Sequence, residues 1–466
     1  MRRLAAMLLS TALCLALFIC PAARAAEQEE TDAEYVGYLV SCPSAFLQES
    51  ADAPLLRGGA AGTLEHVLED IYWTQSESYA LWLLESGRAD FVEPNYVATL
   101  FDTNEGDAGG WQREALCSDA AEALGLDGTG VRVAVIDSGV DPNNPDLADA
   151  KLADGYDYIA GTTEMSDDVS HGTKVAQLLC GDDNNLGVTG LARGCELVPL
   201  RCFSKSHDTT VAELALAVKE AVTRYHCDVI NMSWGLANDS QILHDALRQA
   251  SDAGVALVAA AGNTGTQFPQ GSLVYPAAYD EVISVASVNS SLIAAQDSMH
   301  NAFVTVCAPG ADLSFTLADG SSASGSGTSF ATPCVSALAA LLKQHAGLSG
   351  ADVLALLRER SVDLGDPGFD DVYGYGLPRL DALLVPQRCV LSGRTLSASL
   401  LRREGGTVVL ALYDAQGRMT GMYLDSAADG YGLVRCAAAD DAVSGAAFYL
   451  DESAAPIFAV DRVSLR

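Results

Sequence analysis

Residues 133–139 read VAVIDSG, an apolar run that ends in an aspartate, a serine and a glycine. Apolar, β-rich runs recur along the chain, at residues 131–136, 229–232, 255–259, 282–286 and 303–307. Helical patterns separate them: apolar side chains from Val211 to Tyr225 recur at steps of three and four, and Ser240 suits the N-cap of another helix. Continuous apolar strands that alternate with amphipathic helices predict an α/β fold, with a parallel sheet covered by helices on both faces.

The composition is that of a folded, acidic protein. The chain has 466 residues, of which 49% are hydrophobic and 19% are charged, so a large buried core is expected. The 61 acidic and 27 basic side chains give a net charge of −34. Such a surface repels phosphate backbones, so nucleic acid is not expected as a partner.

The N-terminus has the pattern of a secretory signal. Arg2 and Arg3 precede an apolar run over residues 4–20, and Ala23-Arg24-Ala25 places small residues where a signal peptidase needs them. A membrane anchor is the alternative, but a run of about 17 residues is short for a span. A lipoprotein signal is disfavoured because Ile19 is bulky where a small residue is needed. We therefore expect a secreted or cell-envelope protein of bacterial origin, with no transmembrane segment.

The sequence has 12 cysteines, and Cys14 and Cys20 lie in the expected signal. No C-x-x-C pair occurs, so a zinc or thioredoxin-like site has no support. Cys195 and Cys202 lie along one expected strand, where a rise of about 3.3 Å per residue holds them too far apart to bond. Most of the remaining thiols are expected to be small buried hydrophobic groups.

Two smaller units flank the α/β pattern. Before it, residues 35–40 and 91–100 have strand character and residues 63–71 and 78–85 have helical spacing, which predicts a small α+β unit. After it, short strands predict a small β-rich domain. We divide the chain into a signal at 1–25, an N-terminal unit at 26–101, a Gly-rich linker at 102–110, the α/β domain at 111–385 and the β-rich domain at 386–466. The short strands expected in the last domain are residues 407–413, 419–424 and 447–450.

Three segments carry reactive side chains at the ends of expected elements. Asp137 ends a buried strand, His171 starts a helix, and Ser329 lies where a Gly/Ser-rich run becomes a helix, with Pro333 expected in the first turn. Acyl transfer needs a hydroxyl that attacks, an imidazole that takes its proton and a carboxylate that orients the imidazole. An aspartate, histidine or serine at such a position is more often a helix cap, turn or loop residue than a catalytic one. The prediction of catalysis therefore rests on the occurrence of all three together.

The three segments resemble the signature segments of the subtilisin-like serine proteases, the subtilase family. The matching residues are Asp137, His171-Gly172-Thr173 and 327–333, which read GTSFATP. The resemblance covers residues 111–385 and implies a subtilisin-like fold and a serine endopeptidase. It implies that Ser329 attacks, that His171 is general base and then general acid, and that Asp137 orients His171. No cofactor is implied for the chemistry.

Two further segments match substrate-binding parts of the family. Asn263, at the end of Ala260-Ala261-Gly262-Asn263, resembles the asparagine that donates into the oxyanion hole together with the backbone N–H of Ser329. Without the family, Asn263 is typical of a turn. Ser233-Trp234-Gly235 resembles a wall of the S1 pocket and an edge that pairs with substrate. The resemblance thus implies that Ser233, Trp234, Gly235, Ala260, Ala261 and Gly262 bind substrate.

Residues 27–101 resemble, more loosely, the inhibitor propeptide of the family, mainly through Val92-Glu93-Pro94-Asn95. The resemblance implies a unit that helps the protease domain to fold and then leaves its C-terminal tail in the active site. The family's register places the cut after Phe101, with Phe101 in the S1 pocket and Ala98 in S4. A domain that stays attached is the alternative.

The family often binds calcium through an aspartate near the first segment and a loop after the histidine helix. Asp146 fits the aspartate, and the loop at 181–190 has oxygen side chains of the right kind. The loop looks shorter than the family's calcium-binding versions, so a structural calcium and its absence both stay open.

The sequence predicts a secreted serine endopeptidase that is made as a self-processing zymogen. Its partners are protein or peptide substrates and its own propeptide, which acts as an intramolecular inhibitor. A proteolytically silent relative that binds peptides or partners is the alternative, and the four intact chemical positions disfavour it.

Overall fold

The computed structural model describes residues 35–43, 64–101, 110–207, 209–264 and 268–384. In the C-terminal region it describes residues 388–392, 395–402, 407–425, 430–437, 442–450, 456–459 and 463–464. The expected signal at 1–25 and the expected linker, apart from Gly110, lie outside the described residues.

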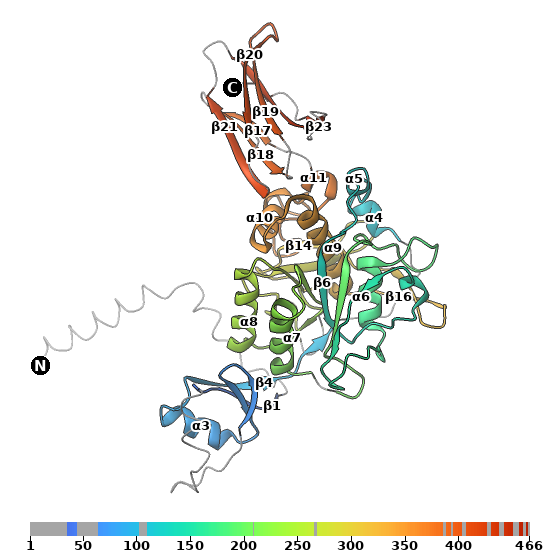
Figure 1. Ribbon diagram of the computed structural model, residues 1–466, viewed down its shortest axis with the longest axis vertical. Helices are drawn as coiled ribbons and strands as arrows, with labels where there is room; N and C mark the ends of the chain where they lie inside the picture. Colours follow the sequence, from blue (N-terminus) through green and yellow to red (C-terminus); the bar gives the residue numbers. More distant parts are fainter. Residues whose placement is uncertain are drawn as a thin grey trace, which may run out of the picture. The chain divides into compact units, whose positions relative to one another are not determined.

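A parallel sheet occupies the centre of residues 110–384 (Figure 1). Its strands are β6 (Arg132–Asp137), β7 (Lys151–Leu152), β8 (Tyr156–Asp157), β9 (Glu196–Arg201), β10 (Val229–Met232), β12 (Ala256–Ala260), β13 (Ile283–Val288) and β14 (Val306–Pro309). The order is β14-β13-β12-β10-β6-β9-β7, with β8 also on β9, and every pairing is parallel. The predicted α/β fold is confirmed.

Helices cover both faces of this sheet, as the strand pattern requires. Alternate residues of β6 point to opposite faces: Val133 and Val135 belong to one buried cluster, and Ala134 and Ile136 belong to another. The helices are α4 (Gln112–Ala115), α5 (Asp119–Glu122), α6 (His171–Cys180), α7 (Val211–Thr223), α8 (Gln241–Asp252), α9 (Thr328–Ala346), α10 (Gly350–Arg360) and α11 (Leu380–Leu383). The first cluster contains the buried side chains of α6 and α9, and the second contains those of α7 and α8.

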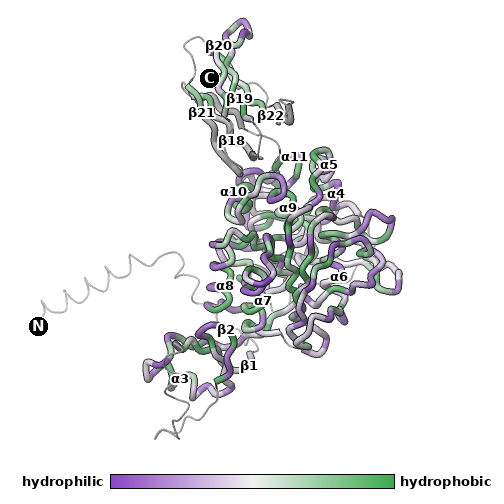
Figure 2. Tube along the Cα trace, in the orientation of Figure 1, coloured by the Kyte–Doolittle hydropathy of each residue, from purple (hydrophilic) through white to green (hydrophobic). Residues whose placement is uncertain are grey.

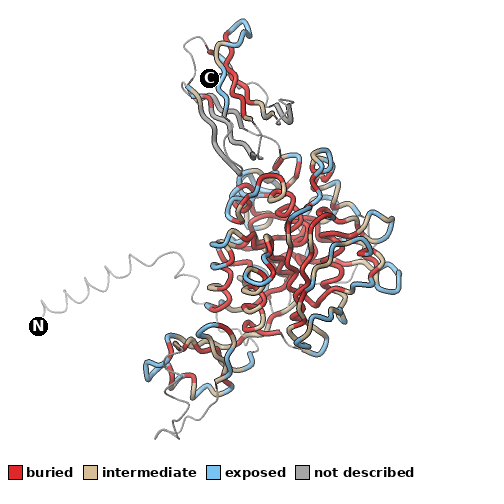
Figure 3. The backbone as a smooth tube through the Cα atoms, in the orientation of Figure 1, coloured by how far each residue is buried: buried red, intermediate tan, exposed pale blue. Residues whose placement is uncertain are grey.

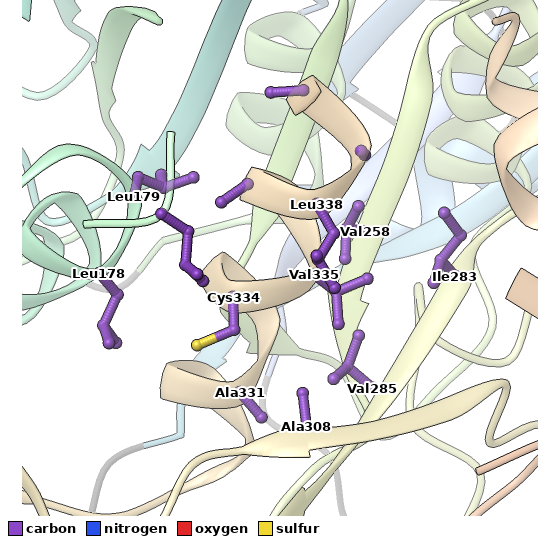
Figure 4. Packing of buried hydrophobic residues seen from close by; sticks show 14 of the residues in the cluster. Leu178, Leu179, Val258, Ile283, Val285, Ala308, Ala331, Cys334, Val335 and Leu338 are labelled. Carbon is purple, nitrogen blue, oxygen red and sulfur yellow. The ribbon is translucent and has the colours of Figure 1, made fainter. Parts of the chain in front are cut away.

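Figure 4 shows the first cluster from close by, with Cys334, Val335 and Leu338 of α9 between α6 and the strands. Hydrophobic residues gather inside this α/β part and hydrophilic residues in its outer loops (Figure 2), and the interior is buried (Figure 3). This packing fixes the starts of α6 and α9 relative to the carboxyl end of β6, where the candidate chemistry lies.

The N-terminal unit is a four-stranded antiparallel sheet with one helix. Its elements are β1 (Tyr35–Ser41), β2 (Glu65–Leu68), β3 (Ile71–Thr74), α3 (Glu77–Glu85) and β4 (Phe91–Tyr96), with sheet order β2-β3-β1-β4. Helical spacing predicted a helix at residues 63–71, and this prediction is wrong. Glu69 and Asp70 form the turn of a β2–β3 hairpin, and β3 pairs with β1.

Two short pairings lie outside these sheets, and the first joins the N-terminal unit to the peptidase part. β5 (Thr99–Leu100) pairs antiparallel with β11 (Trp234–Gly235), and β15 (Leu313–Thr316) pairs with β16 (Ser322–Gly325). No helix in the described residues has the length and apolar character needed to cross a membrane.

The C-terminal region is β-rich, as predicted, but it has more strands than the sequence indicates. One described sheet has the order β17-β18-β21, and the other has the order β20-β19-β22-β23 with β24 also on β22. The strands are β17 (Arg388–Ser392), β18 (Thr395–Arg402), β19 (Thr407–Tyr413), β20 (Met419–Asp425), β21 (Gly430–Ala437), β22 (Ser444–Leu450), β23 (Pro456–Ala459) and β24 (Val463–Ser464).

Candidate active site

The three predicted reactive residues converge at the carboxyl end of β6. Asp137 is the last residue of β6, His171 is the first residue of α6, and Ser329 is the second residue of α9. Their exposed fractions are 0%, 1% and 0%, respectively. Each side chain therefore lies at the end of an element whose direction is set by the packed core.

Asp137 and His171 are directly hydrogen-bonded. Asp137 Oδ1 lies 2.7 Å from His171 Nδ1, and it also accepts the Ser138 backbone N–H at 2.7 Å. A carboxylate at Nδ1 favours the tautomer that carries its proton there, which leaves Nε2 as the basic nitrogen. The pair has the arrangement needed to orient a general base.

Asp167 holds the start of α6, a role that the sequence does not reveal. Its carboxylate accepts hydrogen bonds from the backbone N–H groups of Val169, Ser170 and Thr173 and from the hydroxyls of Ser138 and Thr173. Ser170, just before His171, has a left-handed backbone with φ of 69°. Burial raises the pKa of Asp167, and the nearby charge of Asp137 raises it further. Asp167 therefore positions His171 through the helix start.

Pro333 lies inside α9, beyond the first turn where the sequence analysis expected it. A proline has no N–H, so the carbonyl four residues earlier loses its helical partner. That carbonyl belongs to Ser329, and it accepts the Ser233 hydroxyl at 2.8 Å instead. The hydroxyl of Ser233 in turn accepts the side-chain amide of Asn231 at 2.9 Å. This buried chain of hydrogen bonds fixes the backbone of Ser329.

The end of the N-terminal unit reaches the same point. The carbonyl oxygen of Phe101 accepts a hydrogen bond from the hydroxyl of Ser329. A Cβ atom on Gly327 would lie 2.7 Å from that oxygen and 3.0 Å from Asn263 Nδ2, which shows how closely the three groups approach. A glycine at position 327 is therefore needed to leave this space open.

Asn263 presents its amide nitrogen to this space. Its Oδ1 accepts the Thr328 backbone N–H at 3.0 Å and the Thr328 hydroxyl at 2.9 Å, which fixes the orientation of the amide. Nδ2 is buried and has no hydrogen-bond partner in the described part of the chain. The backbone N–H of Ser329 is among the first N–H groups of α9, which have no partner within the helix. The two donors are suited to an oxyanion.

The substrate-binding residues expected from the sequence surround the tail of the N-terminal unit. Trp234 pairs with Leu100 and Gly235 with Thr99 through the backbone. The Trp234 indole is fully buried and donates to the carbonyl of Ile136 at 3.0 Å, so the side chain belongs to the core. A Cβ on Gly235 would lie 2.6 Å from the Phe101 ring, so this glycine lets the ring approach.

The Phe101 ring lies in an apolar pocket that also includes a residue the sequence analysis missed. Phe268 packs edge-on against Phe101, with centroids 5.3 Å apart. Both belong to the same buried cluster as Ala260, Ala261 and Val274. Gly262 lies close to Val274, and its N–H donates to the Thr328 hydroxyl at 3.2 Å. The pocket is therefore shaped for a bulky apolar group.

Asp146 lies in an environment that suits a cation. Its side chain is fully buried, and neither carboxylate oxygen has a well-formed hydrogen bond in the described residues, although the Val188 backbone and the Asn184 side chain interact weakly with it. Burial raises the pKa of Asp146 to about 7. A Cβ on Gly187 would lie 2.5 Å from Asp146 Oδ2, so the loop at 181–190 closes over the carboxylate.

Gln112, which the sequence analysis missed, faces the same loop. Its Nε2 donates to the carbonyl of Thr189 at 3.3 Å, whereas its buried Oε1 has no partner among the described residues. Unpartnered oxygens from Gln112 and Asp146 are the ligands that a hard cation prefers. The described residues contain no group of three or more His, Cys, Asp or Glu side chains suited to a metal. A cation here would thus depend on the Asp146 carboxylate together with amide and carbonyl oxygens.

Comparison with known proteins assigns the chain to a family. The model of the subtilase family, peptidase S8, matches residues 128–376. The chain belongs to the subtilase family. It is 35% identical to subtilisin DY of Bacillus licheniformis over 266 residues, which cover 57% of this chain and 94% of that relative. It is 29% identical to subtilisin E of Bacillus subtilis strain 168 over 363 residues, which cover 77% of this chain and 92% of that relative.

Other similar proteins extend the comparison. The chain is 35% identical to the minor extracellular protease Epr of Bacillus subtilis strain 168, but the match covers 57% of this chain and only 40% of Epr. The crystal structure of fervidolysin from Fervidobacterium pennivorans, a keratinolytic enzyme related to subtilisin, has the same fold, with a TM-score of 0.65. That match is 21% identical and covers 91% of this chain and 72% of fervidolysin. As a subtilase, the protein is a subtilisin-like serine endopeptidase.

Proposed function

We propose that this subtilase is a secreted endopeptidase that cleaves its own chain between Phe101 and Asp102 and is then inhibited by the released N-terminal unit. The observation that carries the proposal is the hydrogen bond from the Ser329 hydroxyl to the Phe101 carbonyl oxygen. A peptide carbonyl beside the hydroxyl of a Ser–His–Asp set is the placement expected of a substrate or product.

In the proposed mechanism, Ser329 Oγ attacks the carbonyl carbon of the scissile bond while His171 Nε2 takes its proton. Asp137 holds the imidazole and stabilises its positive charge. Asn263 Nδ2 and the Ser329 N–H bind the developing oxyanion. The protonated imidazole then gives its proton to the leaving amine, and water hydrolyses the acyl-enzyme by the same steps. The groups that carry this mechanism are side chains, the backbone N–H of Ser329 and water.

The N-terminal unit at residues 26–101 is the proposed propeptide. Its Glu93 carboxylate accepts the Ser240 hydroxyl at 2.8 Å and the Gln241 N–H at 2.9 Å, at the start of α8. Asn95 Oδ1 accepts the Ala212 N–H at 3.1 Å, at the start of α7. These bonds satisfy N–H groups that the two helices cannot pair themselves. They support a unit that both favours folding of the peptidase and stays bound after the cut.

The pocket around Phe101 supports a preference for substrates with a bulky apolar or aromatic residue before the cut. An edge-on contact with Phe268 favours an aromatic ring by about 0.5–1.5 kcal/mol beyond simple burial. Ala98, three residues earlier, is almost fully buried, and its N–H donates to the carbonyl of Thr209 at 2.9 Å. A small apolar residue is therefore expected at that position of a substrate.

We also propose a structural calcium at Asp146. The unpartnered oxygens of Asp146 and Gln112 would hold it, with carbonyl or side-chain oxygens of the loop at 181–190. A bound cation would neutralise the buried carboxylate and tie the loop to the start of the domain. It has no part in the chemical steps.

Labelling with a fluorophosphonate tests the enzymatic proposal, because the reagent needs an activated serine. The mature protein should be labelled at Ser329, and the His171→Ala variant should lose the label. A folded protein that is not labelled would instead support the silent, peptide-binding alternative.

A further inference from the structure

Two buried thiols lie beside the active-site helix and take no part in the proposed chemistry. Cys180 is the last residue of α6, and Cys195 directly precedes β9. Both are free, with exposed fractions of 1% and 0%. The Cys180 thiol donates to the carbonyl of Ala176 at 3.4 Å, and both cysteines belong to one buried cluster, where the Cys195 side chain interacts with Cys180. The two side chains therefore lie in the same part of the core.

The backbone holds the two residues together independently of their sulfurs. The returning chain bonds to the end of α6: Leu191 N donates to Leu178 O at 3.3 Å, and Ala192 N donates to Leu179 O at 2.8 Å. Cys195 N then donates to Ala192 O at 3.0 Å. Bonding the sulfurs would thus move two side chains towards each other while the backbone keeps its hydrogen bonds.

We propose that Cys180 and Cys195 form a disulfide when the chain folds in an oxidising medium. A small disulfide such as oxidised glutathione is the oxidant. One cysteine thiolate attacks it and releases one glutathione thiolate; the second cysteine thiolate attacks the mixed disulfide and releases the other. The protein loses two protons and two electrons, and two molecules of reduced glutathione are formed.

The bond closes the loop at 181–194, which includes the segment that covers Asp146. Closing a loop of about 15 residues restricts the unfolded chain and stabilises the folded one. The proposal rests on the proposed secretion in one respect, because secretion would bring the chain into an oxidising medium. It does not depend on endopeptidase activity, and its test can fail while that activity stands.

Burial determines when the bond can form. The contact with Cys195, and then burial, raise the pKa of Cys180 well above its usual value. Both side chains are also shut off from an oxidant in solution, so the folded pair reacts slowly. We therefore expect the disulfide to form during folding, before the two cysteines are buried. A chain that folds in a reducing medium should keep both thiols.

Peptide mapping of the full chain tests the proposal. The Ser329→Ala variant, which avoids self-digestion, is refolded either with dithiothreitol or with a mixture of reduced and oxidised glutathione. It is then alkylated in denaturant and digested with trypsin without reduction. Cleavage after Lys174, Arg193 and Arg201 places Cys180 in peptide 175–193 and Cys195 in peptide 194–201. The glutathione sample should contain these two peptides joined, and the dithiothreitol sample should contain both alkylated.

Thermal unfolding of the same two samples gives a second measurement. The oxidised form should melt about 3–5 °C above the reduced form, as expected for a disulfide that closes a loop of this length in a protein of this size. The gap should vanish in Cys195→Ala and persist in Cys202→Ala, which removes another fully buried thiol from the opposite end of β9. If Cys195→Ala does not fold, the peptide map of the chain that keeps both cysteines tests the proposal by itself.

Two results would overturn the proposal. One is a glutathione-refolded chain in which both cysteines are alkylated, or in which Cys180 is joined to a different cysteine. The other is a difference in melting temperature that remains in folded Cys195→Ala.

Discussion

The carbonyl oxygen of Phe101 accepts a hydrogen bond from the hydroxyl of Ser329, 228 positions later in the chain. Phe101 ends the described part of the N-terminal unit, and Ser329 lies in the first turn of α9. The contact aligns one peptide bond of the chain with the proposed nucleophile. Because both groups belong to one molecule, the reaction needs no encounter between separate partners.

Replacing Asn263 with Ala should lower kcat by about 10²–10³ and leave KM nearly unchanged, a magnitude known from the equivalent donor in subtilisin. The amide nitrogen has no hydrogen-bond partner in the described residues, and in the proposed mechanism it donates only to the developing oxyanion. Steady-state kinetics on a peptide with Phe before the cut measure the effect. A change in KM alone would make Asn263 a substrate contact.

The pH dependence of activity should reflect two groups on the acid side. Asp167 accepts its hydrogen bonds as a carboxylate, and burial raises its pKa, so it takes up a proton at a higher pH than an ordinary aspartate. Protonation of the His171 base and then, at lower pH, of Asp167 should therefore give kcat/KM an acid limb that becomes steeper than one proton as the pH falls. In Asp167→Asn the limb should fall to a single proton, and the plateau should be lower.

The sign of the stability effect provides a control for this prediction. A pKa raised on folding means that the folded state binds the proton more tightly than the unfolded state does. The stability from Asp167 is fully present below the pKa of an unfolded aspartate and is lost as pH rises through the raised value. Activity should therefore fall on acidification while the protein is still folded. The circular dichroism signal should stay constant over the pH range in which kcat/KM falls.

Replacing Glu93 with Ala should weaken the hold of the cleaved propeptide on the peptidase by at least about 10-fold, because three hydrogen bonds to a charged acceptor are lost. Gel filtration of the self-cleaved protein measures the fraction that stays bound. Glu85→Ala is the matched control, since Glu85 is exposed on the same unit. Equal retention in the two variants would exclude a role for Glu93 in inhibition.

Removal of calcium should destabilise the protein through Asp146. A ligand at 100 times its Kd stabilises by about 2.7 kcal/mol, so a chelator should lower the melting temperature of the parent by several degrees. The Asp146→Asn variant should no longer respond, whereas Asp149→Asn, which removes an exposed neighbouring charge, should respond fully. A chelator effect that survives in Asp146→Asn would assign the cation to another place.

The sequence predicted the α/β fold and the three converging residues because both depend on short-range patterns. Strands buried on both faces read as continuous apolar runs, and Asp137, His171 and Ser329 lie in dense motifs at element ends. The prediction of a helix at residues 63–71 was wrong because the apolar side chains there, Leu64, Val67, Leu68 and Ile71, also fit one face of a helix. The hairpin that forms instead is determined by the pairing of β3 with β1, which is distant in the sequence.

The roles of single residues that lie outside any motif could not be predicted from the sequence. Gln112 and Phe268 act only through neighbours that the fold brings to them, at the loop of 181–190 and at Phe101. Pro333 was expected in the first turn because proline is favoured there, but α9 continues past it, and Ser233 takes over the carbonyl that the proline leaves unpaired.

N-terminal sequencing of the purified full chain, alongside Ser329→Ala prepared in the same way, tests the central claim most directly. The parent should separate on a denaturing gel into two fragments, and the larger should begin at Asp102. Ser329→Ala should remain one chain. A parent that stays intact while fully active, or a Ser329→Ala chain that is cut after Phe101 when pure, would contradict self-cleavage by Ser329.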